Sequence, residues 1–481
     1  MELGAAGFTG PKSIDTKLNV KPVFVFLAHH NSEEGPCRTG TPEQLDTKGE
    51  RSRAEAAFGP TMARYSQLAP SANWLEPVFI EHGDDWLVKA EEYQKLDKDN
   101  HQVDVYVLDG MSLNQFFAVK LGERFGRPVV MVGGEQTGAL PMGCDAASHL
   151  RAKGLEAYVP LDFDEFNELL ALLQARKAMR QTRILRVSQG QFDNVNGNFL
   201  DIGAYRDHLG FDAVDISIGA FASEWDKVRQ SPDSWRLAQD VAVALEQGAQ
   251  ASHIEREYVA NDVAFYLAAK RLMEDYGCNA FLVNCFEICP DGRVAAVRKT
   301  VPCLTHSLFK DQGLPSACES DLGVLAAIQL LQSVASRTAY MGNIFLMNRH
   351  ENRMKILHDV PGLKLKGYTA PDVPYELRAF TLGGWGTTVR YDFAQDRGQE
   401  VTIARFSPSA DKVLVTHGTI VGGAGFSTPS CSLEVHLDVA DVASYFHKSV
   451  DFGNHSAMVF GDYRAQLRLL SELLNVQVTE A

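Results

Sequence analysis

Four side chains in the second half of the sequence have the chemical types and the settings that a metal-assisted reaction needs. Glu287 comes just past an apolar run, and Asp321 opens an apolar helix pattern after a loop that contains Gly and Pro. His358 ends a short apolar stretch, and His455 lies among small and polar residues. Carboxylate oxygens and imidazole nitrogens together suit Mn²⁺, Mg²⁺ or a similar divalent ion. The sequence therefore predicts a divalent-metal site made of Glu287, Asp321, His358 and His455.

Each of these residues also has a structural interpretation. Glu287 precedes a turn and can simply face water, whereas Glu319 and Asp321 can cap the helix that follows them, because the free N–H groups at a helix start favour anions. The two histidines can be packing residues. Gly453, two residues before His455, allows an unusual backbone angle and a close approach of another group, and both the functional and the structural interpretation of that segment stay open.

Cysteines offer an alternative kind of metal site. Cys285 and Cys289 flank Glu287 with C-x₃-C spacing, which differs from the C-x₂-C spacing of most zinc–thiolate sites. The eight cysteines are scattered, and several lie within apolar runs. This distribution is typical of buried thiols rather than of a disulfide framework.

The elements that must position these residues alternate between short apolar runs and helical patterns up to about residue 357, which predicts parallel α/β sheets. In such sheets, ligands bind at the carboxyl ends of the strands. A polar loop is expected at 29–49. Strands are expected at 23–27, 77–81, 103–108, 128–133, 183–187, 210–217 and 280–285, and helices at 51–65, 113–125, 164–180, 235–248, 261–276 and 322–335.

Beyond about residue 361 the pattern changes to short β segments separated by Gly and Asp turns, followed by one closing helix. The expected fold class is α/β, with two Rossmann-like, doubly wound domains followed by a β-rich, antiparallel, barrel-like domain. Strands are expected at 379–382, 387–393, 400–407 and 412–420, and the helix at 463–474. The expected division is a leader at 1–20, an N-terminal domain at 21–180, a central domain at 181–357 and a C-terminal domain at 358–481.

Composition narrows the function classes. The chain has 481 residues and a formal net charge of −15, which argues against binding to a nucleic-acid backbone. It has no apolar run of 18 residues, so no membrane segment is expected. The first residues lack the pattern of a secretory signal, and the cytoplasm is the expected location.

Two segments carry a resemblance to a known family. The segment 311–321, DQGLPSACESD, resembles the D-x-G-x-x-x-A-C/T-E-x-D segment that opens a helix in fucose-isomerase-like proteins. The segment 453–467 resembles the one that delivers their last histidine. The chain thus resembles a divergent member of the L-fucose/L-arabinose isomerase superfamily, and the order of its three units fits that family.

The resemblance implies a role for each residue. Glu287 resembles the first metal-bound carboxylate of the family, Asp321 the second, and His455 the C-terminal ligand. His358 resembles an additional histidine of the arabinose-isomerase branch, and Glu319 remains an alternative to Asp321. Family members usually use Mn²⁺, with Mg²⁺ or Co²⁺ as other candidates here, and assemble as trimers or hexamers.

The function that follows is a manganese-dependent aldose–ketose isomerase, an intramolecular oxidoreductase that acts on a small sugar through an enediolate. The ion polarises the sugar carbonyl, and Glu287 and Asp321 are the expected catalytic pair that moves the proton. Which of the two is the base, and which sugar is the substrate, stays open. The alternatives are a related epimerase, aldolase or lyase on a sugar-derived substrate, or a non-catalytic sugar-binding protein.

Overall fold

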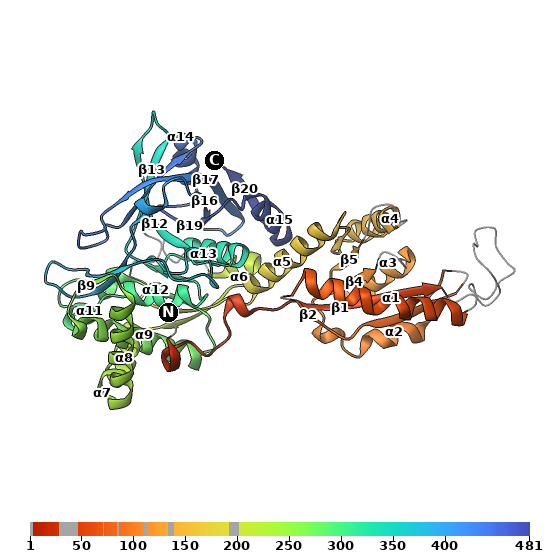
Figure 1. Cartoon of the computed structure of the whole chain (residues 1–481), viewed down its shortest axis with the longest axis horizontal. Coiled ribbons are helices and arrows are strands. Elements are labelled where there is room, and N and C mark those ends of the chain that lie inside the picture. Colours follow the sequence, from red (N-terminus) through yellow and green to blue (C-terminus); the bar gives the residue numbers. More distant parts are fainter. Residues whose placement is uncertain are drawn as a thin grey trace. The chain divides into compact units, whose positions relative to one another are not determined.

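The computed structural model describes residues 3–27, 47–70, 72–83, 86–109, 114–132, 139–191 and 202–481. The chain forms two compact units, one of Lys17–Gln174 and one of Met1–Thr16 with Ala175–Ala481 (Figure 1). Most of the polar loop expected at 29–49 lies outside the described residues.

The smaller unit is a parallel α/β sheet with strand order β2-β1-β4-β5-β6, and β3 also pairs with β1. Helix α1 packs on β1, while α3 and α4 pack on each other and on β5. The strands are β1 Asn19–Leu27, β2 Asn73–Trp74, β3 Val78–His82, β4 Val105–Asp109, β5 Val129–Val132 and β6 Ala157–Tyr158. The helices are α1 Thr47–Leu68, α2 Ala90–Asp97, α3 Gln115–Phe125, α4 Ala139–Ala152 and α5 Phe163–Arg180.

The larger unit begins with a second parallel sheet, in the order β11-β10-β7-β8. Val283 of β10 pairs with Val187 of β7 on one side and with Cys318 of β11 on the other, so the carboxyl ends of the three strands lie level. The strands are β7 Arg183–Val187, β8 Asp212–Ile216, β10 Ala280–Val283 and β11 Ser316–Cys318. The helices are α6 Ile202–Leu209, α7 Ile218–Gln230, α8 Pro232–Gly248, α9 Arg256–Asp275, α10 Cys285–Ile288, α11 Val294–Val297, α12 Cys303–Asp311 and α13 Leu322–Ala335.

A six-stranded antiparallel barrel follows. Its strands run in the order β16-β19-β12-β13-β18-β17, the β16–β17 pairing closes the ring, and β20 adds to β17 in parallel. A small separate sheet joins β9, β14 and β15. The strands are β9 Ala251–His253, β12 Tyr340–Asn348, β13 Arg353–Leu357, β14 Glu376–Ala379, β15 Thr387–Arg390, β16 Glu400–Phe406, β17 Lys412–Ala424, β18 Glu434–Val439, β19 His455–Phe460 and β20 Gln477–Glu480, and the helices are α14 Val442–Ser449 and α15 Arg464–Leu474.

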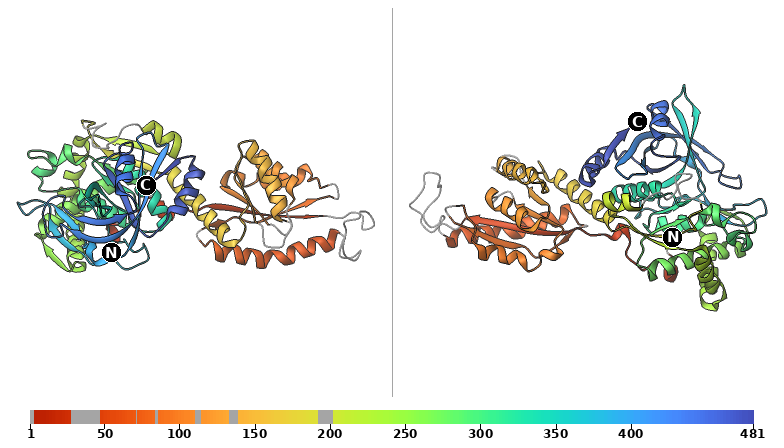
Figure 2. Two further views of the ribbon diagram at one scale, coloured as in Figure 1. Left: turned by 90° about the horizontal axis from the view of Figure 1, so that it is seen from above. Right: turned by 180° about the vertical axis from the view of Figure 1, so that it is seen from behind.

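Helix α13 joins the two layers of the larger unit. It contacts β11 of the parallel sheet and also β16 and β19 of the barrel. Figure 1 and the rear view in Figure 2 show α13 between the barrel strands and the layer that contains α12 and α9. Every residue from Leu322 to Gln332 is buried, since the helix is covered on all sides. The N-terminus of α13 is therefore held at the junction between sheet and barrel.

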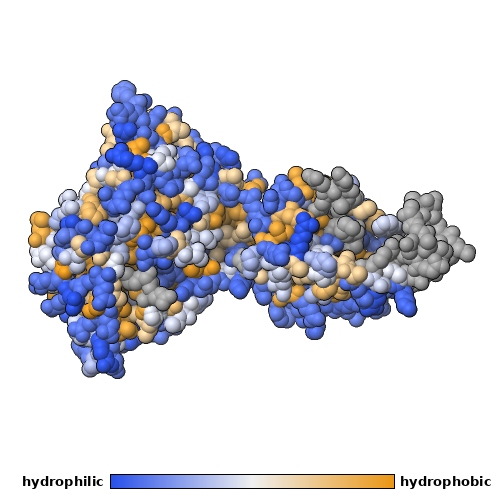
Figure 3. Space-filling model, in the orientation of Figure 1, coloured by the Kyte–Doolittle hydropathy of each residue, from blue (hydrophilic) through white to orange (hydrophobic). Residues whose placement is uncertain are grey.

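The predicted fold class is confirmed: two Rossmann-like parallel α/β sheets precede an antiparallel barrel. The predicted domain boundaries stay predictions. Within the segment 1–20, which the sequence suggested was a leader, Ala6 and Phe8 lie in the core of the larger unit. Figure 3 shows hydrophilic residues over much of the visible face of that unit. Within the described residues, no helix is both long and apolar enough to cross a membrane.

Candidate metal centre

Glu319, His358 and His455 form one buried group. Each residue offers one ligand atom, a carboxylate oxygen or a ring nitrogen, and these three atoms lie within 4.8 Å of one another. Glu319 Oε1 lies 3.4 Å from His358 Nε2, and Glu319 Oε2 lies 3.5 Å from His455 Nε2. The two rings are 5.8 Å apart, centroid to centroid. The group thus contains two imidazoles that share one carboxylate.

Glu319 reaches this position because the chain reverses sharply after β11. Glu319 and the next residue, Ser320, have left-handed backbone angles, with φ of 60° and 54°. Non-glycine residues in this region cost on the order of 1 kcal/mol each, and such strain is often found at functional sites. The N–H of Ser320 donates to Val283 O of β10 at 3.1 Å, which fixes the reversal against the sheet. The strain is therefore held by sheet contacts and places the Glu319 carboxylate above the strand ends.

Asp321, the third residue of this turn, serves two neighbours. Its Oδ1 accepts from Val324 N at 3.0 Å and caps helix α13. Its Oδ2 accepts from Nδ1 of His455 at 2.8 Å. With the ring proton on Nδ1, the lone pair of Nε2 faces Glu319. That Nε2 atom is buried and has no hydrogen-bond partner.

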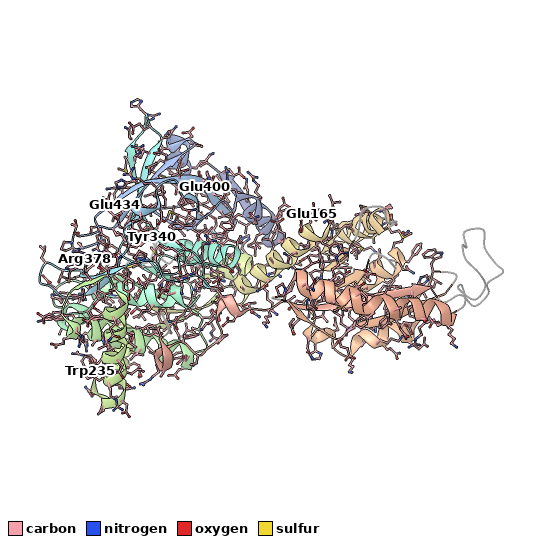
Figure 4. All side chains as sticks on the ribbon, viewed as in Figure 1. Glu165, Trp235, Tyr340, Arg378, Glu400 and Glu434 are labelled. Atoms are coloured by element: carbon pink, nitrogen blue, oxygen red, sulfur yellow. The ribbon has the colours of Figure 1, made fainter. Side chains whose placement is uncertain are left out.

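His358 follows β13 and is held by its backbone. Tyr340 of β12 (labelled in Figure 4) donates its hydroxyl to His358 O at 2.7 Å and accepts from His358 N at 2.8 Å. The N–H of Asp359 donates to His358 Nδ1 at 3.1 Å, so a neutral ring carries its proton on Nε2, toward Glu319. An ion bound at Nε2 would replace that proton, at the expense of the Asp359 contact.

The arrangement fits a divalent cation. Two ligands that each lie about 2.1 Å from a shared ion, at angles of about 90° to 110°, are about 3.0–3.4 Å apart. The distances of 3.4 Å and 3.5 Å between Glu319 and the two histidines are long for hydrogen bonds but close to this spacing. The unpartnered Nε2 of His455 is a free ligand atom, and the Asp321–His455 contact is the carboxylate support that metal-bound histidines usually have.

Charges around the group favour ionised carboxylates. Burial alone would raise the pKa of Glu319, but the hydrogen bond from His358 and the electrostatic effect of the neighbouring His455 ring outweigh it, and the pKa lies below its usual value. Burial also opposes ionisation of Asp321, yet Arg405 and His455 lower its pKa below the usual range. Ionised oxygen ligands are the form that a hard divalent ion binds.

A second buried ion pair shapes the wall next to His358. Arg390 and Asp359 are fully buried and lie 2.6 Å apart. Arg390 also donates to Gly425 O at 2.9 Å and to Thr428 O at 2.9 Å, while Asp359 Oδ1 accepts from Leu433 N at 3.0 Å. The pair therefore fixes the loop between β17 and β18 directly beside the histidine.

Glu287 lies outside the three-residue group. It is 2% exposed, on the short helix α10 after β10. Its carboxylate accepts from Ser188 Oγ at 3.0 Å, from Gln189 N at 2.6 Å and from Gln191 N at 2.8 Å. The residue thus ties the end of β10 to the loop after β7, at the same sheet edge as Glu319.

The structure brings together His358, His455 and, through its contact with His455, Asp321; Glu319 supplies the carboxylate of the group, and Glu287 has other partners. The described residues contain no group of three or more close ligands that includes a cysteine, so the zinc–thiolate alternative has no support in this part of the chain. Seven of the eight cysteines lie in the described residues, and these seven are free thiols.

Arg405 is a participant that the sequence did not indicate. Nothing in the local pattern of strand 400–407 distinguishes a buried arginine from one that faces water. Its partners Asp321 and His455 lie 84 and 50 residues away along the chain. A glycine before the candidate histidine, noted for the close approach it allows, was the available signal.

Comparisons with known proteins point to sugar chemistry. The chain is 27% identical over 185 residues to the sulfoquinovose isomerases of Priestia aryabhattai and Priestia megaterium. The matched region is 37% of this chain and 39% of each relative, so the chain spans well under half the length of the curated relatives it matches. No family model matches the sequence. The chain therefore has a distant, partial similarity to a sugar isomerase.

Proposed function

We propose that this chain is a divalent-metal-dependent aldose–ketose isomerase whose metal ligands are Glu319, His358 and His455. The observation that carries the proposal is the unpartnered, buried Nε2 of His455, which faces Glu319 while Asp321 holds the opposite ring nitrogen. Buried polar groups are normally paired. The Nε2 atom of His306 is also buried and unpartnered, but among the described residues only the His455 atom belongs to a group with a close carboxylate and a second histidine. The partial similarity to sulfoquinovose isomerases supports a sugar as the substrate.

The residues divide the work as follows. A bound ion such as Mn²⁺, Mg²⁺ or Co²⁺ would polarise the sugar carbonyl and stabilise negative charge that develops beside it. Asp321 orients His455 instead of binding the ion directly. Glu287, buried at the neighbouring strand end, is the proposed group that takes and returns the proton of the sugar. It would have to give up part of its contact with the Ser188–Gln191 loop to do so.

The substrate proposed first is sulfoquinovose, the sugar named in the matched relatives, followed by unsulfonated aldoses. Mn²⁺ is the ion proposed first. A homo-oligomer is proposed for the assembly, since the resemblance to fucose and arabinose isomerases implies one.

Metal binding tests the ligand set. Glu319→Gln keeps the side-chain shape but removes the ionised oxygen, so we expect Mn²⁺ affinity measured by isothermal titration calorimetry to fall by at least about 100-fold. His455→Ala should do the same. The matched control is Glu434→Gln on β18, because Glu434 also pairs with a histidine, His436, at 2.8 Å.

The control variant should bind Mn²⁺ like the parent chain, since the described residues give that pair no third close ligand. Parent-like affinity in Glu319→Gln and His455→Ala would refute the ligand assignment. If Glu287→Ala or Asp321→Ala lost affinity while Glu319→Gln and His455→Ala kept it, the site would move to those carboxylates.

A further inference from the structure

Arg405, on β16, holds both partners of the Asp321–His455 hydrogen bond. Its Nη1 donates to Asp321 Oδ2 at 2.8 Å and to the backbone oxygen of His455 at 2.9 Å. Its Nε donates to Phe452 O, three residues before His455. The Arg405 side chain is only 3% exposed. A single guanidinium therefore links the N-terminus of α13 to the first residue of β19.

Two glycines make room for this guanidinium. A Cβ on Gly453, whose φ is 120°, would lie 2.5 Å from Arg405 Nη2, which is too close for any side chain. A Cβ on Gly323 would lie 3.3 Å from the same atom and 2.9 Å from Phe406 O. The backbone thus approaches Arg405 from the helix and from the strand, and the slot is built to hold a planar group.

We infer that Arg405 is a positioning residue for the metal centre, which orients His455 through Asp321. This inference rests on the proposed function, because its consequence is metal affinity. Arg405 balances the charge of the Asp321 carboxylate, which would otherwise be buried without a cation. It also fixes the Oδ2 atom that accepts the hydrogen bond from His455 Nδ1. The Nε2 atom of His455 then points at Glu319 without further adjustment.

Lysine cannot replace this arrangement. Three acceptors from two segments, Asp321 on one side and Phe452 and His455 on the other, receive hydrogen bonds from one rigid fork of N–H groups, whereas an ammonium is a single mobile point charge. In Arg405→Lys we therefore expect the Asp321 charge to remain balanced but the His455 ring to lose its fixed orientation.

The test compares Mn²⁺ dissociation constants, by calorimetry, for the parent chain and five variants. Arg405→Lys should weaken Mn²⁺ binding by about 10- to 100-fold, the range for loss of support behind a metal ligand. Gly453→Ala keeps the Arg405 side chain but displaces its guanidinium, and should therefore weaken binding in the same direction. Arg353→Lys is the matched control. Arg353 forms an ion pair with Asp438 in the barrel, with 2.7 Å between Nε and Oδ1, and neither residue belongs to the candidate site.

A double-mutant cycle separates positioning from general stability. If Arg405 acts through Asp321, Arg405→Lys combined with Asp321→Asn should weaken binding hardly more than Asp321→Asn alone. Additive losses would overturn the inference, as would affinity in Arg405→Lys and Gly453→Ala equal to that of Arg353→Lys. If the parent chain binds no Mn²⁺, the proposed function and this inference fail together. If the parent chain binds Mn²⁺ and the Arg405 and Gly453 variants bind it equally well, only the inference is refuted.

Discussion

At the scale of the residue, the most informative buried carboxyl outside the site is Asp262. It lies on α9 and accepts hydrogen bonds from Val301 N, at 2.9 Å, and from Thr387 N. Burial raises the pKa of Asp262 to about 8, although these donors favour the charged form. The folded chain therefore holds this proton between about pH 4 and pH 8, whereas the unfolded chain releases it near pH 4.

The sign of the resulting pH dependence follows. The folded state binds more protons in this window, so the contribution of Asp262 to the free energy of unfolding is fully present below about pH 4 and is lost as pH rises through about 8. Asp262→Asn removes that loss. The free energy of unfolding of this variant, relative to that of the parent, should therefore increase by roughly a few kcal/mol from pH 4 to pH 8. The altered hydrogen bonds add a cost that does not depend on pH.

Denaturant unfolding at several pH values measures this difference. Asp275→Asn, at the exposed end of the same helix, is the control for removal of one acidic side chain. A gap between Asp262→Asn and the parent that stays constant across the window would mean that Asp262 is ionised in the folded chain.

The turn at 319–321 could not be predicted from the sequence. The segment 319–321 presents two carboxylates two residues apart, and no pattern tells which one faces the histidines. The structure separates them because Glu319 and Ser320 both adopt left-handed angles, so Asp321 caps α13 while Glu319 points at the rings. Backbone angles of this kind are unfavourable for non-glycine residues, and hence are not predicted from residue type.

At the scale of the element, two helix ends offer a paired test of backbone strain. Helix α3 ends before Gly126, with φ of 61°, and α13 ends before Ser336, with φ of 50°. Both residues adopt the left-handed conformation that glycine tolerates best. A Cβ on Gly126 would meet no atom within 4 Å, so the conformation alone decides its cost.

We therefore expect Gly126→Ala to destabilise the chain by about 1 kcal/mol and Ser336→Gly to stabilise it by up to about 1 kcal/mol. Ser336 is exposed, so its hydroxyl has little packing to lose. Chemical denaturation of both variants beside the parent measures the two signs. Equal destabilisation by both changes would show that the left-handed backbone angle does not determine the stability of these two helix ends.

Elements with one clear period were predictable, and those without one were not. Strand 183–187 and helix 322–335 were predicted with the bounds that the structure has. The barrel strands β12, β13, β18 and β19 were not predicted. In β19 all six residues are buried, so the alternation that marks a half-buried strand is absent, and in β12 burial gives way to exposure along its length.

At the scale of the whole larger unit, the candidate centre exists only where three structures meet. Glu319 comes from the edge of the parallel sheet, Asp321 from the start of α13, and His358 and His455 from the barrel. Asp321 and His455 are 134 residues apart in the sequence. Local sequence patterns could indicate each residue as a candidate. That these residues are neighbours follows only from the packing of the closed barrel on α13.

The central claim is metal-dependent interconversion of an aldose and a ketose. The most direct measurement incubates the purified chain with Mn²⁺ and sulfoquinovose, or a panel of unsulfonated aldoses, in D₂O and follows C2 by NMR. We expect a ketose to form with deuterium entering C2 of the recovered aldose, and both changes to disappear with a chelator and in Glu319→Gln. Bound Mn²⁺ with neither ketose nor exchange on any sugar, or exchange without ketose as in an epimerase or lyase, would contradict the account.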